Sequence, residues 1–292
     1  MKIAIAANPH KPAALELARH AVAQIGSRAE IVLSEETLNV APELPHEPLE
    51  SLRPDVVIAI GGDGTFLHAI HRCDAPLLPI NAGTVGVLAE VEAQRPAEFV
   101  AALERLLAGR YYLEERMKLG AQVGPRPLPD AVNEYVLHAA HVGKMGLFEL
   151  AFDDHVVGRV QADGIIIASP TGSTGYSLSS LGPIVDPGID ALVLTTIAPF
   201  RVEARALVVD PLRTVRLRSV ERERPSVLIC DGQEEVPVPP PSYVTVYRAP
   251  RRATLVRFGS RFFQRLRGKR ILPWSEEFSE EGARGADLPP AP

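Results

Sequence analysis

A glycine-rich run with one acid, Gly-Gly-Asp-Gly-Thr at residues 61–65, directly follows the apolar segment 55–60. Because glycine lacks a β-carbon, the backbone can turn sharply there and approach phosphate oxygens closely. A carboxylate beside a bound phosphate can accept a proton from an attacking hydroxyl or help to hold the Mg²⁺ that offsets phosphate charge. A plain turn uses the same residue types, but the apolar segment before it favours a phosphate loop after a buried strand. Asp63 is therefore the candidate catalytic residue.

A second run joins an acid to a loop that is rich in hydroxyl groups and glycine. Asp163 precedes the apolar segment 165–168, and residues 169–179 then place Ser, Thr and Gly around Tyr176. Such a loop offers small donors and acceptors to the base edge and ribose of a nucleotide, and the tyrosine can cover a ring. A solvated linker has a similar composition, but apolar runs on both sides, 165–168 and 191–197, favour a binding loop.

A polar pair, Asn133-Glu134, interrupts the strand-like stretch 131–137. Taken alone, such a pair is more typical of a turn than of a binding site. Its interpretation therefore depends on the motifs around it.

Strand-like and helix-like segments alternate from residue 2 to about residue 110, which is typical of a parallel sheet covered by helices. The expected strands are residues 3–7, 55–60 and 77–81, and the expected helices are residues 12–25, 65–70 and 96–108. The glycine run thus lies between a strand and a helix. Ligands of open α/β folds bind at this edge, where the carboxyl ends of the strands meet.

Many short strand-like segments separated by turn residues follow a boundary at residues 109–114, and they predict a sandwich-like β domain. They are residues 132–137, 147–152, 164–168, 192–197, 214–217, 227–230 and 243–247. A helix is expected at 258–270, where Phe262, Phe263 and Leu266 favour docking on the body of the protein over a membrane or nucleic-acid contact. The expected division is an α/β domain at 1–110, a β-rich domain at 111–257, a docking helix within 258–274 and a disordered tail at 275–292.

Composition excludes several classes of function. The 292 residues carry a formal net charge of -5, whereas a general nucleic-acid binder needs surplus Lys and Arg. No apolar run reaches the roughly 20 residues of a membrane span, and the N-terminus lacks the features of a signal peptide. The two cysteines, Cys73 and Cys230, have no metal-ligand spacing, so reduced thiols and a cytoplasmic location are expected.

The order of the motifs resembles the family of ATP- or polyphosphate-dependent NAD kinases, from about residue 2 to residue 270. The glycine run alone is shared with phosphofructokinases and lipid kinases, whereas the Thr-Gly-Ser-Thr loop with an upstream Asn-Glu pair is far more specific. The matching motifs are Asn8-Pro9, residues 61–65, Asn81 with Gly83 and Gly86, Asn133-Glu134, Asp163-Gly164, residues 171–174 with 176–179, Gly182-Pro183-Ile184 and Asp231-Gly232-Gln233.

The resemblance implies a Rossmann-like N-terminal domain, a β-rich C-terminal domain and phosphorylation of the 2′-hydroxyl of the adenosine ribose of NAD. Asp63 would be the base, and the phosphate loop would comprise Gly61, Gly62, Gly64 and Thr65. Around the adenine would lie Asn133, Thr174, Gly175 and Tyr176, and facing the nicotinamide-side ribose Glu134 and Asp163. Asp63 and Gly64 would also contact NAD, as would the remaining positions His68, Lys144, Gln161, Thr171, Ser177, Leu178, Ser179 and Gln233.

The same resemblance implies NAD and ATP or polyphosphate as substrates, a divalent cation such as Mg²⁺ with no assigned protein ligands, and a homodimer or homotetramer. The chain departs from the family pattern at three positions. Gly175 replaces the usual Ala, Val87 replaces a common Phe, and Gln161 replaces an Arg that could make a charge-assisted contact with the pyrophosphate.

Two rival functions share some of these sequence features. A lipid kinase of the diacylglycerol or sphingosine type shares the glycine run and a β-rich second domain, but it lacks the nucleotide-shaped second loop. A non-catalytic NAD-binding regulator would keep the glycine loop without its chemistry. Asp63 disfavours the regulator, because a neutral Asn could meet the needs of ribose binding alone.

Overall fold

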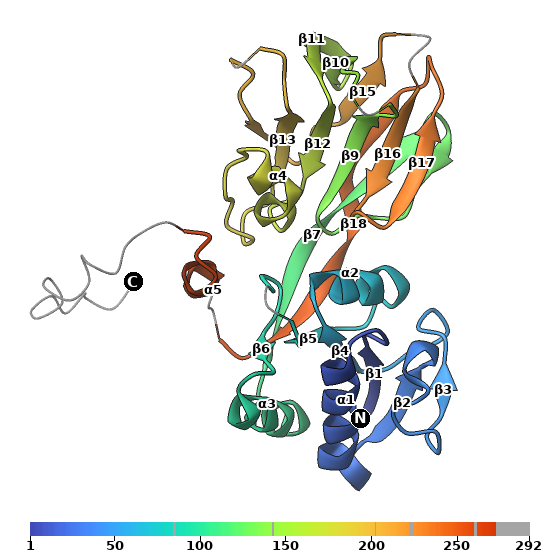
Figure 1. Ribbon diagram of the computed structural model, residues 1–292, viewed down its shortest axis with the longest axis vertical. Helices are drawn as coiled ribbons and strands as arrows, with labels where there is room; N and C mark the ends of the chain where they lie inside the picture. Colours follow the sequence, from blue (N-terminus) through green and yellow to red (C-terminus); the bar gives the residue numbers. More distant parts are fainter. Residues whose placement is uncertain (84–85, 142, 202, 222–224, 260–261, 273–292) are drawn as a thin grey trace, which may run out of the picture. The chain divides into compact units, whose positions relative to one another are not determined.

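The computed structural model describes residues 1–83, 86–141, 143–201, 203–221, 225–259 and 262–272 (Figure 1). Residues Met1 to Phe258 form one compact unit, and a second unit begins at Gly259. None of the described helices is long and apolar enough to span a bilayer.

The N-terminal part is a parallel sheet with helices on both faces, as predicted (Figure 1). Its strand order is β3-β2-β1-β4-β5. Alternate residues of the first strand face opposite layers: Ile3 and Ile5 pack in the apolar cluster with α1 and α3, whereas Ala4 and Ala6 pack in the cluster with α2. The bounds are β1 (Lys2–Ala7), α1 (Pro12–Ile25), β2 (Glu30–Ser34), β3 (His46–Glu47), β4 (Val56–Gly61), α2 (Asp63–Arg72), β5 (Leu77–Asn81), β6 (Val91–Glu92) and α3 (Pro96–Leu107).

The C-terminal part is a sandwich, which confirms the predicted β-rich domain. A six-stranded antiparallel sheet runs in the order β14-β13-β12-β9-β16-β17. Its inward residues, such as Tyr135 and Ile167, share one apolar cluster with residues of the other layer, such as Phe148 and Val246. The six strands are β9 (Glu134–Ala139), β12 (Gly164–Ala168), β13 (Leu192–Ile197), β14 (Leu207–Val209), β16 (Ser226–Cys230) and β17 (Glu234–Val238).

Two long strands join the parts. β7 (Tyr112–Val123) and β18 (Val244–Arg257) pair antiparallel, with a shift of register between Arg248 and Arg252. The end of β18 pairs with β5 through Leu255 and Leu77, so one twelve-stranded sheet runs from the α/β part into the β sandwich. The same sheet includes β8 (Arg126–Pro127), β10 (Gly146–Phe152), β11 (His155–Ala162) and β15 (Val215–Ser219).

Several differences from the sequence prediction have local causes. β7 was not predicted, because Glu114, Glu115, Arg116 and Lys118 hide its apolar alternation. β18 is much longer than the predicted strand 243–247, since it continues past Pro250 where the register shifts. Strands β2, β11 and β17 were also not predicted.

The second unit contains one described helix, α5 (Phe262–Gly268). Phe262 and Leu266 are buried, whereas Phe263 is 51% exposed. The docking of this helix therefore stays a prediction. The predicted tail, residues 275–292, lies outside the described residues.

Candidate active site

The glycine run forms a sharp turn between β4 and α2. Gly61 is the last residue of β4, Gly62 is the N-cap of α2, and Asp63 is the first helical residue, two positions before the predicted start of this helix. Thr65 Oγ1 accepts hydrogen bonds from the Gly62 backbone N–H at 3.5 Å and from Asn8 Nδ2 at 3.3 Å. The turn is thus tied both to its own helix and to the end of β1.

Asp63 points at the chain segment that follows β5. Its carboxylate accepts the backbone N–H of Val87 at 3.1 Å and that of Leu88 at 3.4 Å, one on each oxygen. Backbone donors stabilise the ionised form of a carboxylate, which is the form that accepts a proton. Asp63 is half-buried, and these two hydrogen bonds hold its side chain in one orientation at the edge of the sheet.

Arg257 holds the other side of this segment. Its Nη1 donates to the carbonyl oxygen of Leu88 at 2.9 Å and lies 3.2 Å from Glu90 Oε2, while its Nε donates to Glu114 Oε2 at 2.6 Å. The arginine is 1% exposed, so these contacts lie in the interior. Because Leu88 contacts both Asp63 and Arg257, the buried guanidinium positions the backbone that orients the carboxylate.

A second buried arginine extends this network to the hydroxyl-rich loop. Arg116 Nη2 donates to Glu114 Oε2 at 2.9 Å, and its Nη1 donates to Thr171 Oγ1 at 3.4 Å. Burial, followed by the nearby charge of Arg257, lowers the pKa of Arg116. Two guanidinium groups that share Glu114 therefore link the segment behind Asp63 to the loop that begins at Ser169.

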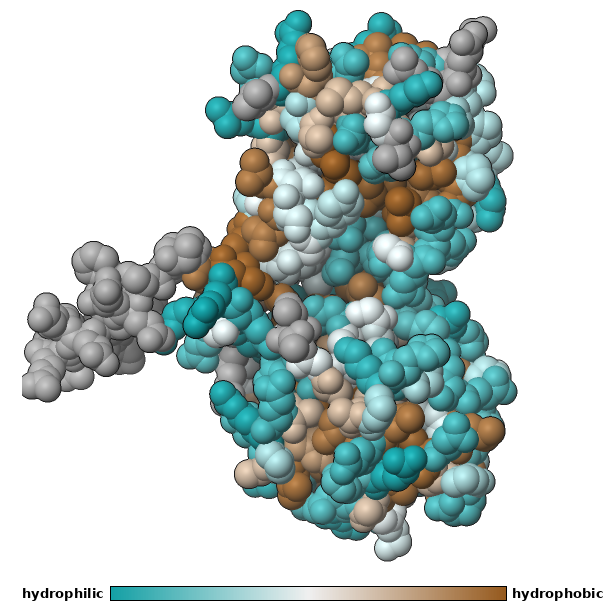
Figure 2. Space-filling model, in the orientation of Figure 1, coloured by the Kyte–Doolittle hydropathy of each residue, from teal (hydrophilic) through white to brown (hydrophobic). Residues whose placement is uncertain are grey.

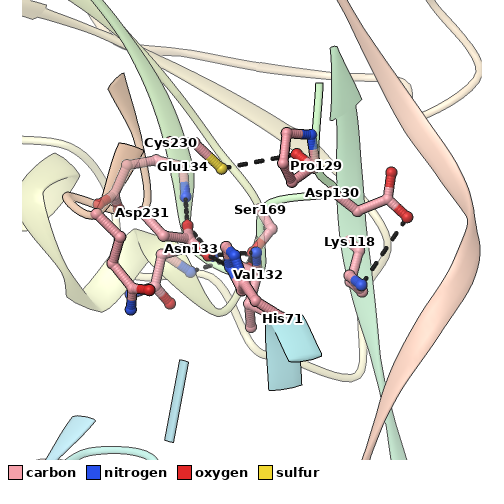
Figure 3. A network of polar contacts seen from close by, with 12 residues as sticks. His71, Lys118, Pro129, Asp130, Val132, Asn133, Glu134, Ser169, Cys230 and Asp231 are labelled. Atoms are coloured by element: carbon pink, nitrogen blue, oxygen red, sulfur yellow. Dashed lines mark hydrogen bonds and ion pairs between the residues drawn. The ribbon is translucent and has the colours of Figure 1, made fainter. Parts of the chain in front are cut away.

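Asp231 organises the Asn133-Glu134 pair (Figure 3). Its Oδ2 accepts the backbone N–H of Val132 at 2.7 Å, and its Oδ1 accepts those of Asn133 at 2.8 Å and Glu134 at 2.9 Å. The same Oδ2 lies 2.7 Å from His71 Nε2. The carboxylate is fully buried, so one side chain satisfies three backbone donors and one histidine.

The Asp231-Gly232-Gln233 turn also reaches the glycine run. Gln233 Nε2 donates to the carbonyl oxygen of Gly64 at 3.3 Å, and His71, which contacts Asp231, lies on α2. The helix that begins at Asp63 and the strand that begins at Glu134 are therefore connected through this one turn.

The hydroxyl-rich loop folds back on Asn133. The backbone N–H of Ser169 donates to the Asn133 carbonyl oxygen at 2.8 Å, and Ser169 Oγ donates to that of Val132 at 2.6 Å. A β-carbon at Gly172 would lie 2.1 Å from the Asn133 carbonyl oxygen, so only glycine allows this approach. The loop then leads to α4 (Tyr176–Ser179), where the Tyr176 side chain is 42% exposed and able to meet a ligand.

Glu134 lies in the interior of this site. It is 7% exposed, and its Oε2 has no hydrogen-bond partner among the described residues. Burial raises the pKa of Glu134 to about 8, the charge of Asp231 adds to this rise, and the Tyr176 backbone N–H opposes it. The folded protein therefore favours the protonated carboxyl at neutral pH.

This shift predicts a pH-dependent stability difference for Glu134→Gln. A carboxyl with a raised folded-state pKa makes the folded protein bind more protons than the unfolded chain between the unfolded value of 4.5 and about 8. The stability of the parent should fall as pH rises through this window. The glutamine side chain cannot ionise, so the variant should gain stability relative to the parent from pH 5 to pH 8. Urea unfolding at both pH values measures the effect, and an equal difference at both would contradict the protonated Glu134.

Some of the predicted NAD-binding residues take part in the contacts of the site, whereas others have partners outside it. Gly64, Asn133, Glu134, Tyr176 and Gln233 belong to the contacts described above. Gly175 lies against Glu134, because a β-carbon there would lie 3.1 Å from Glu134 Oε2. His68 Nε2 lies 2.8 Å from Glu36 Oε1, and the Gln161 carbonyl oxygen accepts the backbone N–H of Phe200. Asp163 bonds through its backbone to Ala139 and Ile197, and Lys144 is exposed in the loop before β10.

The remaining loop residues divide into structural and exposed positions. Thr174 Oγ1 donates to the Thr171 carbonyl oxygen at 3.0 Å, and the buried Ser177 Oγ lies 2.8 Å from Thr195 Oγ1. Leu178 is half-buried and Ser179 is exposed on α4. A role for these residues in binding NAD stays a prediction.

The glycines of the run predict contrasting effects of alanine. A β-carbon at Gly61 would lie 2.3 Å from Thr65 Oγ1, whereas at Gly64 it would meet nothing within 4 Å. Gly62 has φ -124°, so it does not adopt the left-handed backbone conformation that favours glycine. Gly61→Ala should therefore destabilise the fold. Gly64→Ala should raise the free energy of unfolding by roughly 0.5–1 kcal/mol, because alanine has a higher helix propensity than glycine. Urea unfolding separates the two, and a destabilised Gly64→Ala would contradict the open geometry.

Several residues of the site were not predicted as site residues, among them Asp231, His71 and Arg257. The Asp-Gly-Gln motif included Asp231, and its Asp-Gly pair is a usable signal for a tight turn, which the structure shows with a left-handed φ of 47° at Asp231. The sequence has no comparable signal for His71 or Arg257, because their partners lie 160 residues away for one and 143 for the other.

Comparison with known proteins identifies the family. Residues 3–111 match the family model of the ATP-NAD kinase N-terminal domain, and residues 132–258 match that of the ATP-NAD kinase C-terminal domain. The NAD kinase of Thermococcus sibiricus is 38% identical over 269 residues, which cover 90% of this chain and 96% of that protein. The NAD kinase of Heliobacterium modesticaldum is 38% identical over 280 residues, covering 91% and 97%.

Solved structures agree with this assignment. The crystal structure of an NAD kinase from Archaeoglobus fulgidus in complex with ATP has a TM-score of 0.73 at 25% identity, covering 92% of this chain and 98% of that one. The yeast NADH kinase complexed with NADH has a TM-score of 0.82 at 20% identity, covering 94% and 89%, which shows a shared fold. With both domain models matched in order and relatives above 30% identity over nearly the whole chain, this chain belongs to the NAD kinase family.

Proposed function

We propose that this member of the NAD kinase family transfers the terminal phosphoryl group of ATP, or of polyphosphate, to the 2′-hydroxyl of the adenosine ribose of NAD. The hydroxyl oxygen forms a bond to the terminal phosphorus, and the bond from that phosphorus to the bridging oxygen of the donor breaks. The hydroxyl proton passes to Asp63, and the donor leaves as ADP or as shortened polyphosphate. The products are NADP and the leaving group.

The position of Asp63 is the observation that carries this proposal. Asp63 is the first residue of α2, and its carboxylate accepts hydrogen bonds from the backbone N–H groups of Val87 and Leu88. The carbonyl oxygen of the next residue, Gly64, accepts a hydrogen bond from Gln233 Nε2. The proposed acceptor site, around Asn133 and Tyr176, is connected to this helix through Asp231. A carboxylate that can act as a base thus stands beside a glycine-rich turn and a hydroxyl-rich loop.

The contacts support a division of labour within the acceptor site. Asn133 and the loop up to Tyr176 are proposed to surround the adenine, because the loop folds directly on Asn133 and leaves the tyrosine ring accessible. Glu134, with an unpaired Oε2 in the interior, is proposed to hydrogen-bond a ribose hydroxyl. A protonated carboxyl can donate or accept such a bond.

A divalent cation such as Mg²⁺ is proposed as cofactor. Among the described residues no group of three or more His, Cys, Asp and Glu side chains could hold a metal ion. Mg²⁺ at kinase sites is usually held by one or two carboxylates plus substrate phosphates, and Asp63 offers one carboxylate beside the phosphate turn. When bound there, the cation would offset the charge of the donor phosphates.

The rival functions are less well supported. The lipid-kinase alternative rests on the glycine run and a β-rich second domain, whereas the NAD kinase family models and relatives match both domains of this chain. The regulator alternative would leave the oriented carboxylate of Asp63 without a purpose. Incubating the purified chain with NAD, Mg²⁺ and either ATP or polyphosphate, and measuring NADP with an NADP-specific dehydrogenase, tests the proposal. Failure to form NADP with either donor would overturn it.

The acceptor site makes a further prediction. Asn133→Ala and Tyr176→Ala should raise the KM for NAD with little change in turnover, since binding contacts act on ground and transition states alike. The KM for the donor should stay within a few-fold of the parent. Leu212→Ala is a matched control, because this leucine is 73% exposed and lies in a turn before β15. If the donor KM rises instead, the two substrates have been exchanged in the proposed site.

Assembly and location remain proposals. A homodimer or homotetramer is expected, and light scattering coupled to gel filtration measures it. The cysteines Cys73 and Cys230 are both buried and unpaired with each other, which suits the proposed cytoplasmic location.

A further inference from the structure

The side chain of His71 takes no part in the reaction proposed above, yet it joins two elements of the site. It lies in the last turn of α2, the helix whose first residue is Asp63. Its Nε2 lies 2.7 Å from Asp231 Oδ2 (Figure 3). A carboxylate only accepts hydrogen bonds, so the histidine nitrogen is the donor. The imidazole is 13% exposed and the carboxylate is fully buried, so water competes little for this bond.

The three-residue turn between β16 and β17 contacts α2 at two points. Gln233 Nε2 donates to the carbonyl oxygen of Gly64 at one end of the helix, and Asp231 accepts from His71 at the other. Gly64 and His71 are seven positions apart, which is a rotation of about 700° and a rise of roughly 10 Å in an α-helix. The two contacts therefore lie on nearly the same face of α2, close to two full turns apart. Together they fix the rotation of this helix about its axis and its position along that axis.

This turn is itself held by the β sandwich. Asp231 and Gly232 have φ values of 47° and 65°, the left-handed conformation of a tight hairpin turn. The backbone N–H of Gln233 donates to the Cys230 carbonyl oxygen at 2.8 Å, and that of Asp231 donates to the Glu134 carbonyl oxygen at 3.0 Å. The position of the turn is therefore set by β9 and β16, which pair with each other, and not by α2.

The same carboxylate holds the segment that is proposed to bind NAD. Asp231 accepts the backbone N–H groups of residues 132–134 at 2.7 to 2.9 Å. On its other side it accepts from His71, at the end of the helix that begins at Asp63. One side chain thus sets the positions of the acceptor segment and of the helix that carries the proposed base.

Apolar packing alone would restrain α2 less tightly. Phe66, Leu67 and Ile70 of this helix belong to a buried apolar cluster, and Figure 2, in the orientation of Figure 1, shows a mainly hydrophilic surface over the helix. The hydrophobic effect is non-directional, so such packing tolerates small rotations and shifts. Hydrogen bonds prefer a narrow range of lengths and angles, which makes the His71 contact the tighter restraint.

We propose that His71 is a positioning residue for phosphoryl transfer. By donating to Asp231 it holds α2 so that the Asp63 carboxylate meets the ribose hydroxyl of NAD bound at residues 132–134. This inference rests on the proposed function, because it names a residue that aligns the base of that reaction. A displacement of about 1 Å between reacting groups can lower a rate by about 10²-fold, so such a restraint acts on turnover.

A purely structural role makes a different prediction. His71 would then only satisfy the buried carboxylate of Asp231, and its loss would lower the free energy of unfolding. The folded protein would turn over as before. Rate constants of the folded enzyme therefore separate the two roles.

Three variants test the proposal through steady-state rates of NADP formation, with NAD and donor varied independently. His71→Phe keeps a ring but cannot donate, so it should lower kcat by roughly 10-fold or more and leave both KM values within about 3-fold of the parent. His71→Gln places an amide N–H near the position of Nε2, so it should keep kcat within about 3-fold of the parent. Asp74→Asn is the matched control, because the exposed ion pair of Asp74 with Arg251 also joins the end of α2 to β18, away from the two contacts. It should leave all three constants unchanged.

Two kinetic results would overturn the positioning role. One is a kcat of His71→Phe within about 3-fold of the parent, including the case in which only the KM for NAD rises. The other is a loss in His71→Gln as large as that in His71→Phe, because the donated hydrogen bond would then not be what matters.

Amide hydrogen exchange tests the contact independently of activity. In His71→Phe the amides of residues 67–73 should exchange faster than in the parent, because α2 is released. Those of residues 132–134 should keep their protection, since Asp231 still accepts them. If the parent forms no NADP while exchange changes in this way, the restraint on α2 stands and the proposed reaction fails. Unaltered exchange of α2 in His71→Phe overturns the restraint, whatever the activity.

Discussion

Asp63→Asn is expected to lower the turnover number for NADP formation by about 10²–10⁴-fold, the usual contribution of a general base. The amide cannot take the proton from the attacking 2′-hydroxyl, while contacts to the rest of NAD remain. The KM for NAD should therefore change little, because the lost interaction acts only in the transition state. Steady-state rates with NAD and donor varied independently measure both constants.

The geometry around Asp63 adds a second expected effect. Each carboxylate oxygen accepts one backbone N–H, from Val87 on one side and from Leu88 on the other. The asparagine NH₂ must face one of these donors, so the variant should also lose about 1–3 kcal/mol of stability from an unpaired donor. Asp74→Asn is the matched control, since this 73% exposed carboxylate follows the same helix and pairs with Arg251. Turnover of Asp63→Asn within a few-fold of the control would remove Asp63 as the base.

Local patterns predicted much of the fold because the elements around the glycine run carry their own signals. The helix Pro12–Ile25 has a proline in its first turn and apolar residues on one face, and it forms with the predicted bounds. The apolar strand Leu77–Asn81 is buried throughout and also forms as predicted. Such segments need no information from distant parts of the chain.

The strands that join the two parts show why other features were missed. Tyr112–Val123 contains four charged residues within five positions, which is typical of an exposed segment, yet Arg116 and Lys118 are buried in the structure. Their burial is possible because partners such as Glu114 and Asp130 lie nearby in the fold. A sequence pattern that counts charges as exposed cannot recognise a buried ion-pair network.

The candidate site divides in the same way. Asp63, Asn133 and Tyr176 were predicted from motifs, because their residue types match a chemistry that can be stated from the sequence. The Asp231 carboxylate connects the segments that carry these residues. It accepts hydrogen bonds from the backbone N–H groups of residues 132–134, which lie almost 100 residues away in the sequence. Backbone donors are identical at every position, so no sequence pattern identifies them as partners.

Asp231→Ala is accordingly expected to be among the most destabilising single changes in this protein. It removes the acceptor of three backbone N–H groups and of His71, at buried or partly buried positions, and it places alanine at a left-handed φ of 47°. Unpaired buried donors and the strained backbone should together cost about 3–5 kcal/mol of unfolding free energy. The KM for NAD should also rise, because the backbone of Asn133 and Glu134 loses its anchor.

Two further variants separate the causes of this loss. Asp231→Asn tolerates the left-handed φ and keeps an oxygen for the N–H groups of Asn133 and Glu134, so it should cost less than Asp231→Ala. His71→Ala leaves all three backbone donors accepted and should cost the least. Urea unfolding of the three variants measures this order. Equal losses for His71→Ala and Asp231→Ala would mean that the histidine contact, and not the three backbone bonds, stabilises the segment, and the anchoring role of Asp231 would then be wrong.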